Sequence, residues 1–175
     1  MSVAYPDISR DRDRWILSHR PARNAVDPLR PHAFVAEQER AETGEVVSIS
    51  TLFLTNRECP WRCAMCDLWT FTTAADTPRG AIAAQVAAAH EELRAMSEAI
   101  TLLKLYNAGS FFDPRAVPES DYEDVAAALV GLTHVVVESH PSLVGPRVDR
   151  FLDALQRRAA STVRLEVAMG LHRVF

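Results

Sequence analysis

The sequence predicts an α/β fold, a partial (β/α) barrel of about four βα units with a short N-terminal extension. Short apolar or β-branched runs alternate with helical patterns along most of the 175 residues. The composition, 48% hydrophobic and 24% charged, is that of a globular domain with its own core. A closed βα barrel needs more strands than this chain supplies, so the predicted barrel is partial.

The N-terminal part favours an extension followed by two strands. The charged, proline-punctuated stretch 7–30 is typical of a short helix and then an extended arm. Apolar or alternating runs at 33–37 and 46–54, with Gly44 between them, predict two strands joined by a turn. We assign residues 1–45 to the N-terminal extension and 46–175 to the core domain.

Three patterns predict the first helix and the second core strand. The stretch 80–97 is rich in alanine, glutamate and leucine, which favour helix. Its stripe for the buried face consists of Ile82, Val86, Leu93 and Met96. The apolar run 100–106 then predicts a buried strand, and the polar stretch 107–110 a tight loop.

The C-terminal part repeats this alternation. A capping box at 120–123 predicts the start of a helix that continues over 125–132, and 133–138 is a β-branched strand. Apolar residues at helical spacing near 148–155 and an alternating run at 162–168 complete the pattern. Such alternation predicts parallel strands, whose carboxyl ends form the ligand-binding edge. We expect the core to be truncated at its C-terminus.

Charge and hydropathy exclude several classes of protein. The net charge of -4 and the pI near 5.9 argue against a broad basic surface for nucleic acid. Charged residues at 10–14 leave no room for a signal peptide, and no apolar run is long enough to cross a bilayer. We therefore expect a soluble, cytoplasmic protein without a membrane partner.

The cysteines carry the most specific signal. The chain has three, Cys59, Cys63 and Cys66, and an odd, clustered set is typical of metal binding in a reducing compartment rather than of disulfides. Three thiolates around a 4Fe-4S cluster leave one iron open for a ligand. Tetrahedral zinc bound by three cysteines and a histidine is the alternative, although zinc ligands usually come as two separated pairs. Inert buried thiols are a third interpretation.

The stretch Cys59-Pro-Trp-Arg-Cys63-Ala-Met-Cys66 and the apolar strand before it resemble the motif of the radical S-adenosylmethionine superfamily. The resemblance implies that a 4Fe-4S cluster on the three cysteines binds S-adenosylmethionine. The reduced cluster then cleaves this cofactor to a 5'-deoxyadenosyl radical, which abstracts a substrate hydrogen. It also implies an electron donor such as ferredoxin or flavodoxin.

The same resemblance implies further cofactor contacts, which are Met65, Gly109, Ser110, Glu138 and His172. Met65 stands where the family commonly has an aromatic residue whose backbone touches the adenine. The stretch 107–110 lies at the place of the family's Gly-rich loop, although turns use the same residue types. Glu138 matches a Glu-x-x-Pro motif, and a solvated helix-capping role is its alternative. His172 replaces an acid or amide expected to reach the ribose.

The wider loop 56–69 and the segment 106–112 are similar to archaeosine-synthase-associated radical enzymes, within the branch of the elongator subunit and the methylthiotransferases. This similarity implies a substrate such as a tRNA or a nucleoside. The other hypothesis is a non-catalytic iron-sulfur or zinc module. The remaining histidines, at 19, 32, 90 and 134, show no metal spacing and are interpreted as surface or satisfied polar groups. His140 is given no catalytic role.

Overall fold

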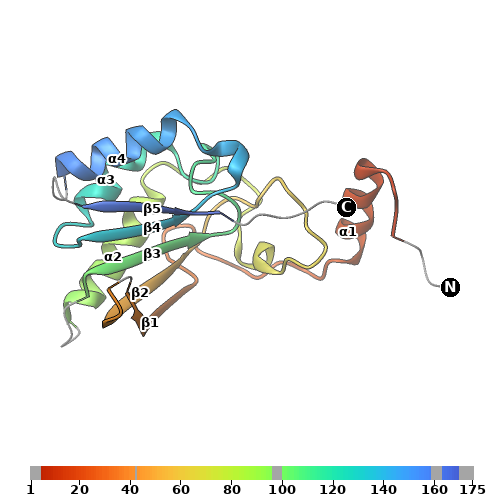
Figure 1. The fold of residues 1–175 in the computed structure, drawn as a ribbon. Coiled ribbons are helices and arrows are strands. Elements are labelled where there is room, and N and C mark those ends of the chain that lie inside the picture. Colours follow the sequence, from red (N-terminus) through yellow and green to blue (C-terminus); the bar gives the residue numbers. More distant parts are fainter. Residues whose placement is uncertain (1–4, 42, 96–99, 159–162, 170–175) are drawn as a thin grey trace.

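The structure is a computed structural model, and it describes residues 5–41, 43–95, 100–158 and 163–169. The described residues form a mixed α/β fold around one five-stranded sheet of order β1-β2-β3-β4-β5 (Figure 1). The strands are β1 (Ala33–Arg40), β2 (Val46–Leu54), β3 (Leu102–Asn107), β4 (His134–Glu138) and β5 (Arg164–Ala168).

The sheet is mostly parallel. β2, β3, β4 and β5 pair in parallel in chain order, and β1 pairs with β2 in the antiparallel sense. The register puts Phe53 beside Tyr106, and it brings the last residues of β2 and β3, Leu54 and Asn107, side by side. The carboxyl ends of the parallel strands therefore meet at one edge, as the alternating pattern predicts.

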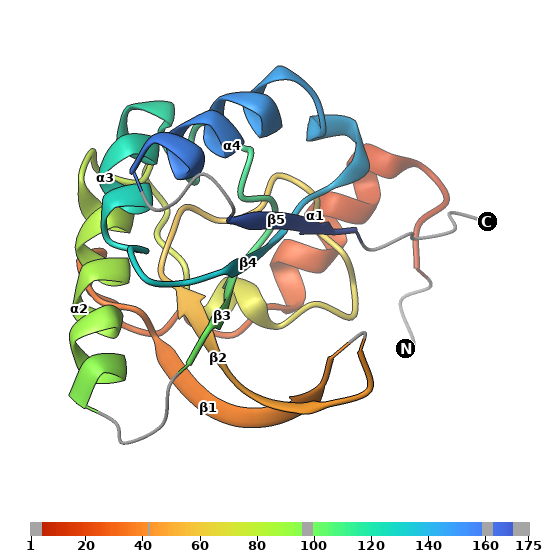
Figure 2. The same cartoon turned by 60° about the vertical axis from the view of Figure 1, so that its left-hand side comes forward.

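Helices cover one face of this sheet. α2 (Ala81–Ala95), α3 (Tyr122–Ala127) and α4 (Pro146–Arg158) gather on the same side of the strands, whereas α1 (Ser9–His19) stands beside the loops at the carboxyl edge (Figure 2). The core lies between the sheet and the three helices. Alternate residues of the parallel strands enter it, and Leu103, Leu105 and Val137 are fully buried there.

Strands and helices fall close to their predicted positions. The two N-terminal strands, the helix after the cysteines, the three later strands and the helix near 148–155 are all present. Met96 of the predicted stripe and the first residue of the run 162–168 lie outside the described residues. Among the helices described, none is long and apolar enough to cross a membrane.

The predicted capping box is wrong. Ser120 lies in a short 3-10 turn (Glu119–Asp121), and its hydroxyl donates to the Asp121 carboxylate at 3.3 Å instead of capping a helix. Asp121 in turn accepts the backbone N–H of Gly80 at 2.9 Å. The hydrogen bond between Asp121 and Gly80, at the start of α2, thus stands in place of the local cap. The helix itself, α3, ends at Ala127, earlier than predicted.

Candidate functional site

The cysteine loop leaves the carboxyl end of β2 and is fixed at its root by α2. The buried Gln85 side chain accepts the Thr55 N–H at 2.8 Å and donates to the Thr55 carbonyl at 2.7 Å. The loop closes where Thr73 donates its N–H to Asn56 O and Glu58 donates to Thr73 O, at 2.9 and 3.1 Å. Residues 59–72 therefore project as one loop from the sheet edge.

All three cysteines lie in this loop as free, partly exposed thiols. Cys66 donates its backbone N–H to Cys63 O at 3.2 Å, which turns the chain between them. Burial, with the neighbouring Cys63 and Cys66 sulfurs and Asp113 adding to it, raises the pKa of the Cys59 thiol to about 11. Within the described part of the chain, no group of three or more Cys, His, Asp or Glu is arranged to hold a metal ion.

The loop after β3 presses its backbone against Cys59. Gly109 has a φ of +117°, and a Cβ at this position would lie 3.0 Å from Cys59 Cβ and 3.3 Å from its sulfur. Glycine is needed here both for the backbone conformation and for the close approach. Gly109, expected from the resemblance to lie at the site, is thus brought against the first cysteine.

Ser110 and its neighbours tie the loops of the carboxyl edge together. The buried Ser110 hydroxyl lies 2.9 Å from the Ser139 hydroxyl, and Phe111 donates its N–H to Glu138 O at 2.8 Å. Ser139 donates its N–H to Ala168 O at the end of β5, at 2.9 Å. The loops after β3 and β4 are therefore bound to each other and to the end of β5.

Of Glu138, Met65 and His172, which the resemblance also places at the cofactor, the structure describes the first two. Glu138 ends β4 at the same edge, where burial raises the pKa of its carboxyl group. Met65 is 82% exposed and contributes no buried wall to the site. His172 lies outside the described residues.

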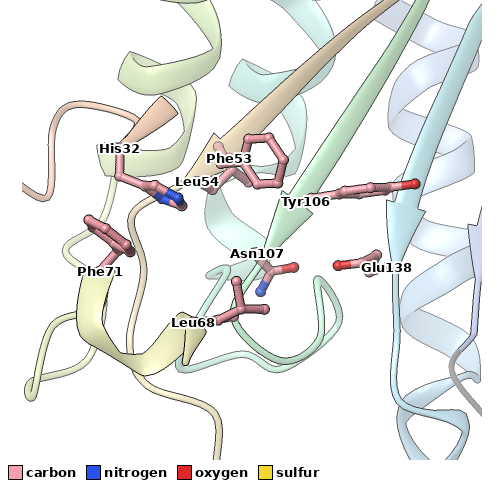
Figure 3. Close-up of a pocket in the computed structure, with 9 residues that line it drawn as sticks. His32, Phe53, Leu54, Leu68, Phe71, Tyr106, Asn107 and Glu138 are labelled. Carbon is pink, nitrogen blue, oxygen red and sulfur yellow. The ribbon is translucent and has the colours of Figure 1, made fainter. Parts of the chain in front are cut away.

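A pocket of about 130 Å³ opens at the ends of β2, β3 and β4 (Figure 3). Asn107 and Glu138 point toward each other, and the rings of Phe53 and Tyr106 lie above them in this view. Asn107 is only 4% exposed, yet within the described part of the chain neither its amide oxygen nor its amide nitrogen has a hydrogen-bond partner. The rest of the wall consists of His32, Phe53, Leu54, Leu68, Phe71, Tyr106 and Ala108.

His32, interpreted as a surface or satisfied histidine, lies half-buried in the wall of this pocket. Its ring stacks on Phe71 with centroids 4.6 Å apart, and its buried Nδ1 has no hydrogen-bond partner among the described residues. Burial lowers the pKa of the imidazole, although a hydrogen bond with the Leu54 backbone opposes this. The half-buried ring is therefore bonded by the Leu54 backbone, and only its Nδ1 is left over.

Two arginines of the N-terminal arm form ion pairs with Glu58, the residue before the first cysteine. Arg20 and Arg23 donate to the two carboxylate oxygens of Glu58 at 2.5 and 2.6 Å, and Arg23 also reaches Thr72 Oγ1 at 2.7 Å. Burial alone would raise the pKa of Glu58, but the hydrogen bonds and charges of the two arginines hold it below its ordinary value. This ion-pair group fastens the arm to both ends of the cysteine loop.

Sequence patterns predicted neither the ion pairs of Glu58 with the two arginines nor the aromatic side chains in the pocket wall. Arg20 and Arg23 precede Glu58 by 38 and 35 residues and form no local motif with it. A second unforeseen contact is the stack of Trp61 on His140, with centroids 3.8 Å apart and planes at 7°. It joins the cysteine loop to the loop after β4.

Comparisons of the chain with protein-family models, with curated proteins and with solved structures found no match. Function must therefore be argued from the chemistry of the residues gathered at the carboxyl edge.

Proposed function

We propose that this chain is a radical S-adenosylmethionine enzyme whose three loop cysteines hold a 4Fe-4S cluster. The observation that carries the proposal is the place of the cysteines. Cys59, Cys63 and Cys66 follow the first parallel strand at the carboxyl edge, and the glycine of the next strand's loop packs against Cys59. In parallel α/β folds this edge is where ligands bind.

The donor set suits such a cluster. All three thiols are free, and three thiolates on four irons leave one iron for the cofactor. A cluster held by all three sulfurs requires loop 59–66 to bring them together, because the described residues include no such gathered group. When bound and reduced, the cluster supplies the electron for reductive cleavage of S-adenosylmethionine.

The surrounding residues have defined tasks in this proposal. Because Gly109 has no side chain, the backbone of its loop can lie against Cys59. Glu138 offers a carboxylate to polar groups of the cofactor. The Ser110 hydroxyl is already bonded to Ser139, so its task is to position the loop. Met65 and His172 keep their proposed contacts to the adenine and the ribose.

The architecture supports the fold that the proposal needs. Four parallel strands in chain order, with helices on one face only, are what an open segment of a (β/α) barrel contains. We propose that residues 46–175 are that segment and that residues 1–45 are an extension. A reductant such as ferredoxin or flavodoxin and a cytoplasmic location belong to the same proposal, as does a nucleoside or tRNA substrate.

The decisive experiment is anaerobic reconstitution with iron and sulfide. We expect about four irons per chain and an electron paramagnetic resonance signal of the reduced cluster that changes when S-adenosylmethionine is added. Cys63→Ala should abolish the signal. Ala64→Ser, at an exposed position of the same loop, should preserve it. A cluster that ignores S-adenosylmethionine would contradict the enzyme.

A zinc module is the second candidate. Three thiolates and one histidine are a donor set for tetrahedral zinc, and all three thiols here are free. In that case the protein purified without reconstitution would be colourless and would hold one equivalent of zinc, which Cys63→Ala would release. No iron-sulfur cluster would then form.

A further inference from the structure

The stack of Trp61 on His140 joins two loops of the carboxyl edge that are held in different ways. His140 belongs to the loop after β4, and Trp61 lies between the first two cysteines of loop 59–72. The ring centroids are 3.8 Å apart, with planes at 7°. Stacked aromatic side chains attract each other beyond the area that they bury.

The His140 side of the stack is held firmly in place. Ser139, the residue before it, donates its N–H to Ala168 O at 2.9 Å, and its hydroxyl lies 2.9 Å from the Ser110 hydroxyl. The imidazole Nδ1 accepts the Ser142 N–H at 3.2 Å and lies 2.7 Å from the Ser142 hydroxyl. His140 is therefore fixed both in its backbone and in the direction of its ring.

The Trp61 side belongs to the cysteine loop, which hydrogen bonds with Thr73 close at its base. Trp61 stands midway between Cys59 and Cys63 along the chain. All three thiols are partly exposed, so a reagent in the solvent reaches them more easily when the loop moves. A contact between Trp61 and a fixed ring therefore restrains the thiols on both sides of it.

We propose that His140 is a positioning residue, which acts through Trp61 to hold the cysteine loop against the loop after β4 and to limit solvent access to the thiols. Both residues are distinct from those assigned to the cofactor. The stack itself requires neither iron nor S-adenosylmethionine. Its consequence for a cluster, which is slower release of iron, rests on the proposed function.

The test is alkylation of the reduced, iron-free chain with iodoacetamide, followed by mass spectrometry of each cysteine. His140→Ala should raise the alkylation rate of Cys63 about 3- to 10-fold, which converts to about 0.6–1.4 kcal/mol. His140→Phe keeps a flat ring that stacks on Trp61 and should restore most of the protection. An unchanged rate in His140→Ala would overturn the inference, as would a rate in His140→Phe as high as that in His140→Ala.

A matched control has the same pair of side chains outside the cysteine loop. Trp15 and His19 stack within α1, with centroids 4.1 Å apart. His19→Ala removes this stack and should leave the alkylation rates of all three cysteines unchanged. An equal acceleration in His19→Ala would mean that the loss of any stack loosens the chain, and it would overturn the role given to His140.

A double-mutant cycle separates the stack from a general loss of folding. In the Trp61→Ala background, the added His140→Ala should change the alkylation rates no further, because the contact is already gone. A further acceleration of the same size would show that His140 acts elsewhere and would overturn the inference. The indole N–H resonance of Trp61 supplies a direct signature, because it should shift in His140→Ala and stay in place in His19→Ala. An unshifted resonance would exclude the stack in solution.

Reconstituted protein links the stack to the proposed cluster. Iron should pass to a chelator about 3- to 10-fold faster from His140→Ala than from the unmodified chain, the same factor as for alkylation. A chain that assembles no cluster but shows the expected alkylation pattern would contradict only the proposed function. A cluster that senses S-adenosylmethionine, together with alkylation rates that ignore His140, would contradict only this inference.

Discussion

The helix-covered face of the sheet and its carboxyl edge differ in the chemistry of their buried side chains. On the covered face, side chains such as Leu103, Leu105 and Val137 are apolar and fully buried. At the carboxyl edge, the described residues include a buried amide without a partner, a carboxyl with a raised pKa and a glycine pressed against a cysteine. The first region stabilises the fold. The second keeps polar groups that folding alone does not need.

The largest expected contrast is in packing. Leu105→Ala removes a side chain that is fully buried on the covered face and should cost about 2–5 kcal/mol of unfolding free energy through lost burial and a cavity. Leu68→Ala, at the pocket rim where the side chain is 40% exposed, should cost less than about 1 kcal/mol. Urea unfolding measures both, and equal losses would show that the edge is packed like the core.

The second contrast concerns glycine. In Gly109→Ala the new Cβ meets Cys59 at 3.0 Å, whereas in Gly44→Ala it meets no described residue within 4 Å. Both positions have positive φ, so both variants carry backbone strain of about 1–3 kcal/mol. The crowding at Cys59 should make Gly109→Ala the worse variant by a further 1–3 kcal/mol, roughly the cost of overpacking. Thermal unfolding of the two variants would reveal a smaller difference if the loop simply moves away.

The two regions also differ in how far sequence predicts them. On the covered face, hydrophobic periodicity identifies the strands and α4 because burial itself generates the pattern. At the edge, the cysteines and Gly109 are visible as local motifs. His32 and Glu58 become parts of the site only through contacts with residues far along the chain, such as Phe71 and Arg23.

The capping box failed for the same reason that these contacts were missed. Ser120 and Glu123 match the local pattern, but Asp121 is bound to Gly80, which lies 41 residues away. A tertiary hydrogen bond then outweighs a local one of similar strength. Local rules therefore describe the covered face well and the edge poorly, because long-range polar contacts assemble the edge.

The third prediction tests whether the ion-pair group at the edge is stabilising. Glu58 is mostly buried between Arg20 and Arg23, so a double-mutant cycle of Arg23→Ala with Glu58→Ala should give a coupling of about 1–2 kcal/mol. Arg158 and Glu123 form a pair of the same 2.6 Å length that is largely exposed. Their cycle should give a smaller coupling, which salt weakens further.

Equal coupling in the two cycles would show that burial adds nothing to the Glu58 pair. The same variants can be reconstituted with iron and sulfide. If the arm positions the cysteine loop, Arg23→Ala should retain less cluster than Arg158→Ala at equal stability.

The smallest expected effect is the change in unfolding temperature caused by Glu138→Gln at the carboxyl edge. Its pKa is raised in the folded chain by burial, so the native state holds the proton more tightly than the unfolded state. Stability due to this group is therefore full at pH values below the ordinary glutamate pKa and is lost as the pH rises through the folded pKa. Glu138→Gln cannot ionise, and its unfolding temperature should exceed that of the unmodified chain at pH 7.5 but not at pH 4.

Glu119→Gln supplies the opposite sign in the same scan. Hydrogen bonds from Arg150 and Arg147 lower the pKa of Glu119 despite partial burial, so its charged form stabilises the fold at neutral pH and the variant should melt lower there. If both variants melted lower at pH 7.5, the Glu138 carboxylate would be contributing to stability like any surface ion pair. A rise for Glu138→Gln alone means that the carboxyl edge holds a charge at the expense of stability, which is what a binding group does and a structural group does not.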